Sequence, residues 1–235
     1  MSMGCASVGG AARSRETSPM RIVIQCADSK VSGSGRLCTS SGEPVSFVAR
    51  PDEARASSLA GTYYARPDDP ASGEGRSWRD LLCDYNTSVA NSLRLMQAAR
   101  LYKHHAYADL VGKFGLERVF ILSAGWGLVR GTFLLPKYDI TFNGAAKSYK
   151  RRRQQDHWPD FRHLEDTGEP IVFFGGKDYQ SLFSRLTFGF SSPRTVYYRS
   201  KEPPDVPGCK LVRYDTTTRT NWHYECVTGF LEGKV

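Results

Sequence analysis

Short apolar segments that end in turns constrain the fold of this chain more than any other feature. Three of them occupy Arg21–Cys26, Arg118–Leu122 and Ile171–Phe174. Each has the length and composition of a buried strand. Segments with helical periodicity separate them along the chain. The sequence therefore predicts an α/β fold, a single domain with a largely parallel central sheet flanked by helices.

Periodicity and cap signals predict the remaining elements. Ser77 followed by Asp80 indicates the start of a helix. The other expected elements are a helix over about 88–113, a polar helix and loop over 154–169, a helix over 178–186, a strand over 194–198, a short edge strand over 211–214, and a closing helix over 220–231 capped by Thr220 or Asn221.

The two regions without long periodic segments receive separate predictions. Residues 1–19 are small and polar, which is typical of a disordered leader, so the domain is expected to span residues 20–235. Residues 32–75 are rich in Gly, Ser, Pro and Asp and too long for an ordinary loop. We expect an irregular excursion there, with short strands near 45–49 and 62–65 and a possible role as a substrate lid.

The charge balance favours a polyanionic partner. The chain has 32 Lys and Arg against 24 Asp and Glu, a formal net charge of +8. Nucleic acid is therefore the first partner expected and an anionic membrane the second. No apolar run reaches the length of about 18 residues that a membrane helix needs. Scattered cysteines and histidines without metal-ligand spacing predict a cytoplasmic monomer with reduced thiols and with no metal or cofactor.

Polar groups follow the predicted strands at the points where these end. Asp28 and Lys30 follow the first strand, Trp126 the second, and Gly176 and Lys177 the third. Carboxyl ends of parallel strands meet at one edge of a sheet, so these residues are expected to share a cleft. The glycines around Trp126 allow a tight turn and a close approach to a ligand. Lys177, at a strand–glycine–helix junction, is placed to bind an anion at a helix N-terminus.

Candidates for handling a nucleobase occur near these strand ends. A base flipped out of a duplex needs an aromatic side chain to stack on and amide groups to recognise its edge. Trp126 and Tyr138 are the candidates for stacking, and Gln25 and Asn143 the candidates for recognition. The alternative is that both aromatics simply belong to the core.

Two carboxylates are candidates for the chemistry. Breaking a glycosidic bond passes through an oxocarbenium-like state, which a carboxylate stabilises or captures. Asp139 and Asp28 have that potential role, and Lys30 is a candidate to neutralise a departing base or grip a phosphate. The alternatives are that Asp139 is a turn residue and that Asp28 caps the following element.

A cationic run provides candidate contacts to a nucleic-acid backbone. Aromatic residues at Tyr149 and Trp158 flank it, a combination that matches phosphate contacts with stacking groups nearby. The alternative is a solvated helix face. The run consists of Lys147, Lys150, Arg151, Arg152 and Arg153.

Three motifs in chain order resemble a widespread domain of bacteria and phages. Its members carry I-L-S-A-x-x-G-L and then P-Y-D, which resemble Ile121–Leu128 and P-K-Y-D over Pro136–Asp139. Their C-x-x-S-K resembles Cys26–Lys30, and their G-x-x-Y-x-x-L resembles Gly176–Leu182. The likeness spans residues 21–186 and leaves out residues 31–75 and the tail from Arg194.

That domain looks related to the DNA-binding peroxide-stress protein YaaA. It is also similar to the core of archaeosine synthases, whose fold is like that of uracil-DNA glycosylases, and it resembles phage-defence glycosylases that excise hypermodified cytosines. The glycosylase signature G-Q-D-P-Y is absent from this chain. The resemblance implies a uracil-DNA-glycosylase-like fold and a protein that acts on nucleic acid or on modified bases.

The leading functional hypothesis is a DNA glycosylase that flips a modified base, hydrolyses its bond to the sugar and leaves an abasic site, in DNA repair or antiviral defence. A non-catalytic DNA-binding stress protein of the YaaA type is the first alternative. A tRNA base-exchange enzyme or its accessory subunit is the second. A nucleotide-binding module built on Gly175, Gly176 and Lys177 is the third. Four measurements discriminate these hypotheses. Abasic product would indicate the glycosylase, and DNA binding without product the stress protein. Selective binding of structured tRNA would indicate the base-exchange enzyme, and binding of a free mononucleotide the nucleotide-binding module.

Overall fold

The computed structural model describes residues 19–56, 61–71, 75–88 and 90–235. The expected leader and parts of the 32–75 excursion lie outside these ranges. The elements in chain order are β1 (Arg21–Gln25), β2 (Val45–Phe47), α1 (Pro51–Ala56), β3 (Tyr63–Ala65), α2 (Trp78–Thr87), β4 (Met96–Gln97), η1 (Ala98–Arg100), α3 (His105–Phe114), η2 (Leu116–Arg118), β5 (Val119–Ser123), β6 (Gly127–Arg130), β7 (Leu134–Leu135), η3 (Ser148–Lys150), β8 (Phe161–Arg162), β9 (Ile171–Phe174), α4 (Lys177–Leu186), β10 (Arg194–Tyr198), β11 (Cys209–Arg213) and α5 (Trp222–Leu231).

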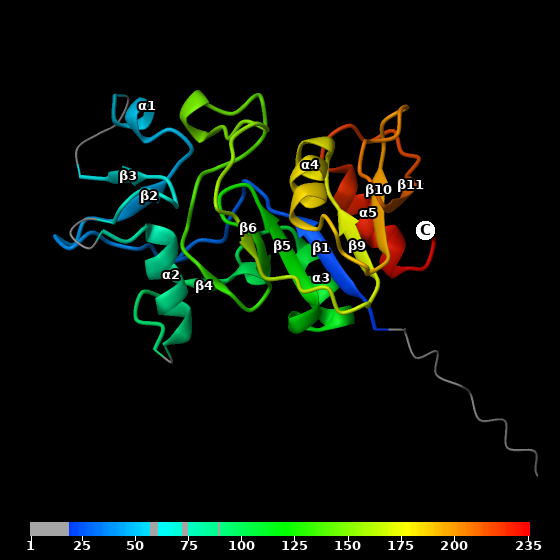
Figure 1. The fold of residues 1–235 in the computed structure, drawn as a ribbon, viewed down its shortest axis with the longest axis horizontal. Coiled ribbons are helices and arrows are strands. Elements are labelled where there is room, and N and C mark those ends of the chain that lie inside the picture. The colour runs from blue at the N-terminus through cyan, green and yellow to red at the C-terminus, as the bar shows by residue number, and fades with distance from the viewer. Residues whose placement is uncertain (1–18, 57–60, 72–74, 89) are drawn as a thin grey trace, which may run out of the picture.

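The central sheet of the described residues has seven strands in the order β11-β10-β9-β1-β5-β6-β8 (Figure 1). From β11 to β5 every neighbouring pair is parallel, with Ile22 opposite Val119 on one side of β1 and opposite Val172 on the other. β5 and β6 form an antiparallel pair. The prediction of a largely parallel central sheet is confirmed.

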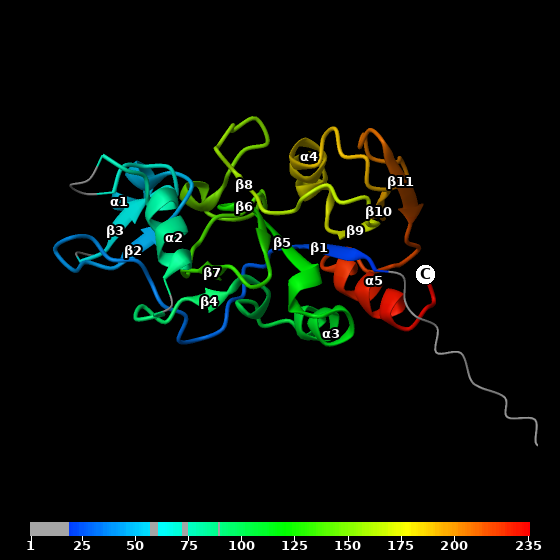
Figure 2. The same cartoon turned by 60° about the horizontal axis from the view of Figure 1, so that its bottom comes forward.

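Helices cover both faces of the sheet. Figure 2 shows α4 on one face and α3 with α5 on the other. Inward-facing residues of β1, β5 and β9 are fully buried, including Ile22, Ile121 and Phe173. Strands that are covered on both faces have to be apolar along their whole length, which is why these segments were recognisable as unbroken apolar runs.

One predicted helix begins much later than the sequence indicated. Helical structure was expected from about residue 88, whereas α3 begins at His105 and is preceded by turns, β4 and η1. The Asn91 side chain accepts a hydrogen bond from the Leu95 backbone N–H and donates one to the Leu95 carbonyl. A side chain that occupies backbone groups in this way replaces the bonds of a helix. The helix ends at Gly115, whose φ of +83° suits glycine.

The polar helix expected over 154–169 is also absent. This stretch is an irregular loop that contains the short strand β8. Pro159 lacks the N–H that a helix would need there. The Arg153 backbone N–H donates to the Asp156 carboxylate, which holds a turn instead. The loop runs beside β6, to which β8 pairs in parallel.

The excursion at residues 32–75 contains the two short strands that were expected. β2 and β3 pair in parallel, and α1 packs beside them. Phe47 of β2 contacts the rings of Trp78 and Trp126, at 6.0 and 5.0 Å between centroids. This unit therefore lies at the β6–β8 side of the sheet (Figure 1), far along the molecule from α5 and β10.

The glycine turn after β5 is filled by the chain itself. β5 and β6 form a hairpin around Ala124, Gly125 and Trp126. Gly127 has φ +87°, and a Cβ atom there would lie 2.6 Å from Asp160 Cβ and 2.7 Å from the Phe161 backbone. We expected these glycines to allow a close approach to a ligand, but at Gly127 the close approach is to the protein's own backbone.

Candidate functional site at the carboxyl edge of the sheet

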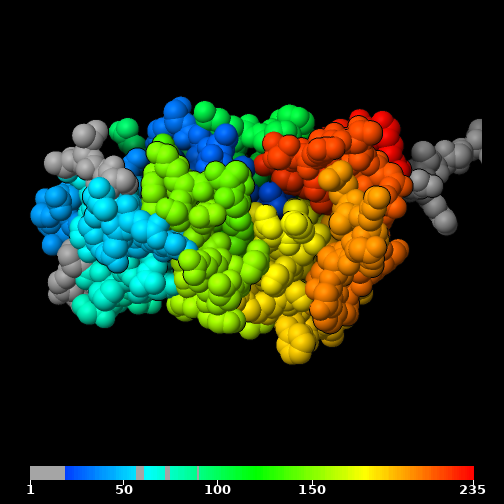
Figure 3. Space-filling model, turned by 90° about the horizontal axis from the view of Figure 1, so that it is seen from above, coloured from blue at the N-terminus to red at the C-terminus, as the bar shows by residue number. Residues whose placement is uncertain are grey.

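A cavity of about 510 Å³ lies where the order of the parallel strands reverses. Within the sheet, β5 lies on one side of β1, and β9, which comes later in the chain, lies on the other side of β1. Open α/β sheets bind ligands in the crevice beyond the carboxyl ends of strands at such a point. Seen from above, the surface is hollowed where the blue end of β1 shows between yellow-green, yellow and red segments (Figure 3).

The ends of β1 and β9 are fastened to each other at the base of this cavity. Gln25 Oε1 accepts a hydrogen bond of 2.7 Å from the Gly176 backbone N–H. The Gln25 carbonyl in turn accepts one from the Tyr107 hydroxyl at 2.7 Å. Gln25 therefore lines the cavity, as expected for a base-recognising residue, but its side-chain oxygen is already used by the protein.

Asp28 provides an exposed carboxylate on the cavity wall. The turn that carries it is held by Lys30, whose Nζ donates to the carbonyls of Ala27 at 3.2 Å and Asp28 at 3.5 Å. The Lys30 ammonium also lies 4.2 Å from the centroid of the Tyr138 ring. Burial lowers the pKa of Lys30, although Cys26, Asp139 and Asp28 act to raise it. Lys30 does not line the cavity and is placed to position Asp28.

A network of hydroxyl and thiol groups lies beneath the Asp28 turn. Cys26 Sγ is 3.2 Å from the Tyr179 hydroxyl. The Tyr138 hydroxyl accepts a hydrogen bond from Ser123 Oγ at 2.8 Å and lies 2.7 Å from the Tyr102 hydroxyl. Burial raises the pKa of the three tyrosines well above the ordinary value, so they stay neutral. Cys26 and Tyr179 belong to the cavity wall.

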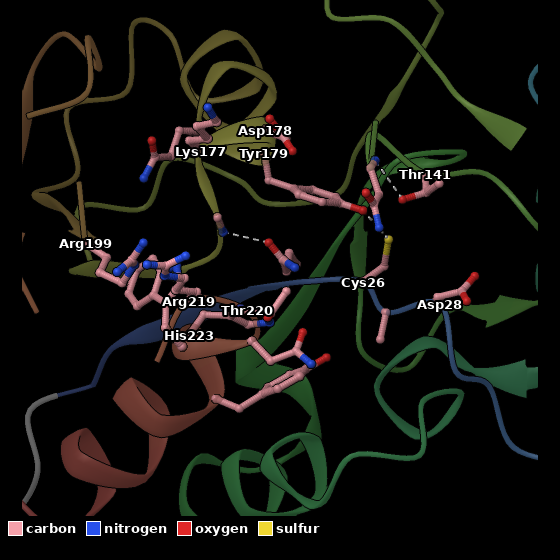
Figure 4. A pocket seen from close by; sticks show the side chains of 18 of the residues that line it. Cys26, Asp28, Thr141, Lys177, Asp178, Tyr179, Arg199, Arg219, Thr220 and His223 are labelled. Carbon is pink, nitrogen blue, oxygen red and sulfur yellow. Dashed lines mark hydrogen bonds between the residues drawn. The ribbon is translucent and has the colours of Figure 1, made fainter. Parts of the chain in front are cut away.

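The opposite end of the cavity carries positive charge. Lys177 stands at the start of α4, Arg199 follows β10, and Arg219 precedes α5. Figure 4 shows Arg199 and Arg219 on one side of the pocket and Cys26 and Asp28 on the other. The cavity therefore has cations at one end and the Asp28 carboxylate at the other, and Asp178, the neighbour of Lys177 in the chain, is a second carboxylate on its wall. The expectation that Asp28, Gly176 and Lys177 share a cleft agrees with this arrangement.

Trp126 and Tyr138 do not lie on the cavity wall. Trp126 is fully buried between Phe47 and Phe161, with ring centroids at 5.0 and 6.2 Å. Tyr138 is 2% exposed, and one face of its ring is covered by Lys30. Neither ring presents an open face to a base, because the hairpin and the excursion cover them. In this structure the two aromatics are core residues, which was the alternative interpretation.

Asp139 and Asn143 differ in their relation to the cavity. Asp139 lies outside it and forms an ion pair of 2.6 Å with Lys150. Its backbone N–H donates to the Phe47 carbonyl, so it connects the loop to β2. Asn143 lines the cavity mouth, but its side-chain oxygen accepts from the Ala145 N–H in a local turn. Of the two candidate catalytic carboxylates, Asp28 therefore borders the cavity and Asp139 does not.

The cationic run divides into buried and exposed members. Arg152 is fully buried and forms two hydrogen bonds of 2.7 Å with the Asp160 carboxylate, so it cannot contact a nucleic acid. Lys150 is paired with Asp139. Arg151 donates to the Gly144 carbonyl and is half-buried. Lys147 and Arg153 are exposed.

A groove beside these cations adjoins the cavity. It encloses about 370 Å³ and is lined by Arg50, Arg151 and Arg153 among others. Asp178 belongs both to this groove and to the cavity. An extended polyanion that follows the groove would therefore pass the cavity mouth.

Sequence reasoning missed most of the cavity wall after β10. Arg199 and Arg219 stand in segments with neither glycine motifs nor apolar periodicity, and the resemblance ends before them. His223 and Tyr224 lie in the first turn of α5 and also line the cavity. The recognisable signal was the pair of strand ends at β10 and β11, because a parallel sheet brings these segments to the same edge as Asp28.

Comparisons with protein-family models, with curated proteins and with solved structures found no match to this chain. Among the described residues, no helix is long and apolar enough to cross a membrane. In the same part of the chain, no group of His, Cys, Asp and Glu side chains has the arrangement needed to hold a metal ion.

Proposed function

We propose that this protein is a DNA glycosylase that takes one modified nucleotide from DNA into the cavity and hydrolyses the bond between base and sugar. The observation that carries the proposal is the polarity of the cavity, with the Asp28 carboxylate at one end and cations at the other. Its volume of about 510 Å³ lies in the range of small-ligand pockets. The open parallel sheet with helices on both faces supports a uracil-DNA-glycosylase-like fold.

The chemistry of hydrolysis assigns a role to the carboxylate end of the cavity. In hydrolysis, the bond from C1′ to the base nitrogen breaks, a water oxygen bonds to C1′, and the water proton goes to the departing base. Positive charge develops on the sugar before the water bond is complete, and the Asp28 carboxylate stabilises that charge. Lys30 acts by holding the turn that carries Asp28. DNA would follow the groove beside Arg151 and Arg153.

The test incubates the protein with unmodified, damaged and hypermodified DNA and reveals abasic sites with alkali. We expect abasic sites on one class of DNA, and Asp28→Asn should lower the rate about a hundredfold or more, as expected for loss of a transition-state charge contact. Asp139→Asn is the matched control, because it makes the same change outside the cavity, and it should lower the rate less than tenfold. Equal losses in the two variants would contradict the role of Asp28.

A non-catalytic DNA-binding protein is the second candidate. It is favoured by the Asp28 side chain itself, since no described residue donates a hydrogen bond to its carboxylate. Tight, salt-sensitive DNA binding without abasic sites on any substrate would favour this candidate. Selective binding of structured tRNA would instead favour the base-exchange alternative.

A further inference from the structure

The cationic end of the cavity is assembled from three separate chain segments. Lys177, Arg199 and Arg219 each line it, from α4, from the end of β10 and from the loop before α5. Within the described residues, none of the three forms an ion pair or side-chain hydrogen bond. The carboxylates on the same cavity wall belong to Asp28, at the far end, and Asp178. Cations on one cavity wall that have no ion pair among the described residues favour an anionic ligand there.

Two helices begin at the same end of the cavity. α4 and α5 each contain ten residues, and neither N-cap residue, Gly176 or Asn221, caps its helix with a side-chain hydrogen bond. Gly176 and Asn221 both line the cavity. The first backbone N–H groups of a helix have no partner inside the helix and carry partial positive charge. Such groups bind phosphate oxygens in many proteins.

His223 is an independent indication of a ligand at this end. Its side chain lines the cavity and is only 3% exposed, and its Nε2 has no hydrogen-bond partner among the described residues. Burial, with a smaller effect of His104, lowers the pKa of His223 to about 3, so the imidazole is neutral at physiological pH. A buried polar atom almost always has a partner in the functional state of a protein. A molecule bound in the cavity would supply the partner that the described residues do not.

We infer that this end of the cavity is a binding subsite for a nucleotide phosphate. Lys177, Arg199 and Arg219 neutralise the phosphate, and the first N–H groups of α4 and α5 donate to its oxygens. The sugar and base then extend toward Cys26 and Asp28, which places the bond to be broken at the carboxylate end. The assignment of the ligand as a nucleotide rests on the proposed function, whereas the phosphate contact can be measured without any excision.

The test measures binding of deoxynucleoside 5′-monophosphates, of the matching nucleosides and of inorganic phosphate by calorimetry. We expect a monophosphate to bind at least about tenfold more tightly than its nucleoside, and phosphate to compete with it. Arg199→Gln and Arg219→Gln should each weaken monophosphate binding about tenfold, as for loss of a charge-assisted hydrogen bond. Lys113→Gln, an exposed lysine of α3 outside the cavity, is the control and should have no effect.

Two results would overturn the inference. One is equal affinity for nucleoside and monophosphate, or no detectable binding of any phosphate compound. The other is unchanged monophosphate binding in both Arg199→Gln and Arg219→Gln. Circular dichroism of each variant shows whether a loss of binding reflects loss of the fold, and reversal of the loss by Arg199→Lys would show that charge is what matters.

A second arm of the experiment distinguishes the two sources of the phosphate. A short DNA duplex with a tetrahydrofuran abasic analogue presents a phosphodiester, and a free monophosphate presents a monoester. Preference for the duplex assigns the subsite to DNA, and preference for the monoester assigns it to free nucleotides. Phosphate binding without abasic product would contradict base excision and support the phosphate subsite. Abasic product formed at the wild-type rate by both arginine variants would support base excision and contradict the phosphate subsite.

Discussion

The ends of β5 and of β1 have similar sequence patterns but different surroundings in the structure. Both strands are short apolar runs followed by small and polar residues. Beyond β5 the chain turns back as β6, and Trp126, Phe47 and Phe161 pack into the space. Beyond β1 the chain leaves an open cavity bordered by Asp28 and the start of α4. One strand end is part of the core, and the other borders an open cavity.

The difference follows from the position of each strand in the sheet. β1 lies where the chain departs in both directions, so the connections after β1 and β9 diverge and leave a crevice. β5 is followed at once by an antiparallel partner, whose hairpin closes directly over its end. A glycine turn after a strand therefore indicates close approach of something, but the topology decides whether that is a ligand or the protein's own chain.

The largest effect is expected from alanine at Gly127, in the hairpin after β5, in comparison with alanine at Gly176, which follows β9 at the cavity. Gly127→Ala forces a positive φ on a residue with a Cβ and drives that atom to 2.6 Å from Asp160 Cβ. We expect it to lower the free energy of unfolding by about 4 kcal/mol, as for severe overpacking combined with backbone strain. Gly176→Ala is the control, since its Cβ would lie 3.6 Å from the nearest atom, Gln25 Oε1. Urea denaturation measures both, and equal losses would break the comparison.

A smaller effect is expected within the cationic run. Arg152→Met leaves the buried Asp160 carboxylate with Arg185 as its remaining ion-pair partner and removes a hydrogen bond to the Ala124 carbonyl of the hairpin. We expect the free energy of unfolding to fall by about 3 kcal/mol. Arg153→Gln, one residue further, should leave thermal stability unchanged and weaken DNA binding in a salt-dependent way. Thermal melts and binding at two salt concentrations separate the two arginines. A stable Arg152→Met variant with weaker DNA binding would contradict the structure.

The smallest effect concerns the stability of the protein in acid, to which the buried His223 of the cavity wall contributes. The pKa of His223 is about 3 in the folded protein, against 6.5 ordinarily, so between these values the unfolded chain binds the additional proton. Stability is therefore retained above about pH 6.5 and lost as pH falls, by about 2 kcal/mol between pH 7 and pH 5 for this one group. In His223→Gln, the loss of unfolding free energy between pH 7 and pH 5 should be smaller by this amount, as measured by denaturant titrations at the two pH values. The exposed His105, changed to Gln, is the control, and the same slope in His223→Gln and wild type would refute the prediction.

In the tertiary structure, most of the candidate site residues lie outside the cavity. Gln25, Asp28, Asn143 and Lys177 line the cavity, as the clustering of strand ends led us to expect. The other candidates lie outside it, in the core, in ion pairs or on the neighbouring surface: Lys30, Trp126, Tyr138, Asp139, Lys147, Lys150, Arg151, Arg152 and Arg153. Arg152 is too deeply buried for the expected DNA contact, and the roles expected of the other residues in catalysis or DNA binding stay predictions.

The sequence by itself determined the elements with strong local signals. The apolar runs of β1, β5 and β9 specify strands because a strand covered on both faces needs apolar residues throughout. Ser77 and Asp80 form the expected reciprocal cap of α2, since both partners lie within one turn. Local composition also predicted that polar groups gather at the carboxyl edge of the parallel sheet, and the cavity lies there.

Only the tertiary structure decided which side chains line the cavity. Arg152 and Arg153 are neighbours of the same chemical type, yet Asp160, eight residues away from Arg152, buries one and leaves the other in solvent. Arg219 and His223 reach the cavity only because β11 adds to the sheet in parallel and returns the chain to the edge where β1 ends. Burial and the sharing of one cavity depend on contacts between distant segments, and the type of a residue and its local spacing do not contain that information.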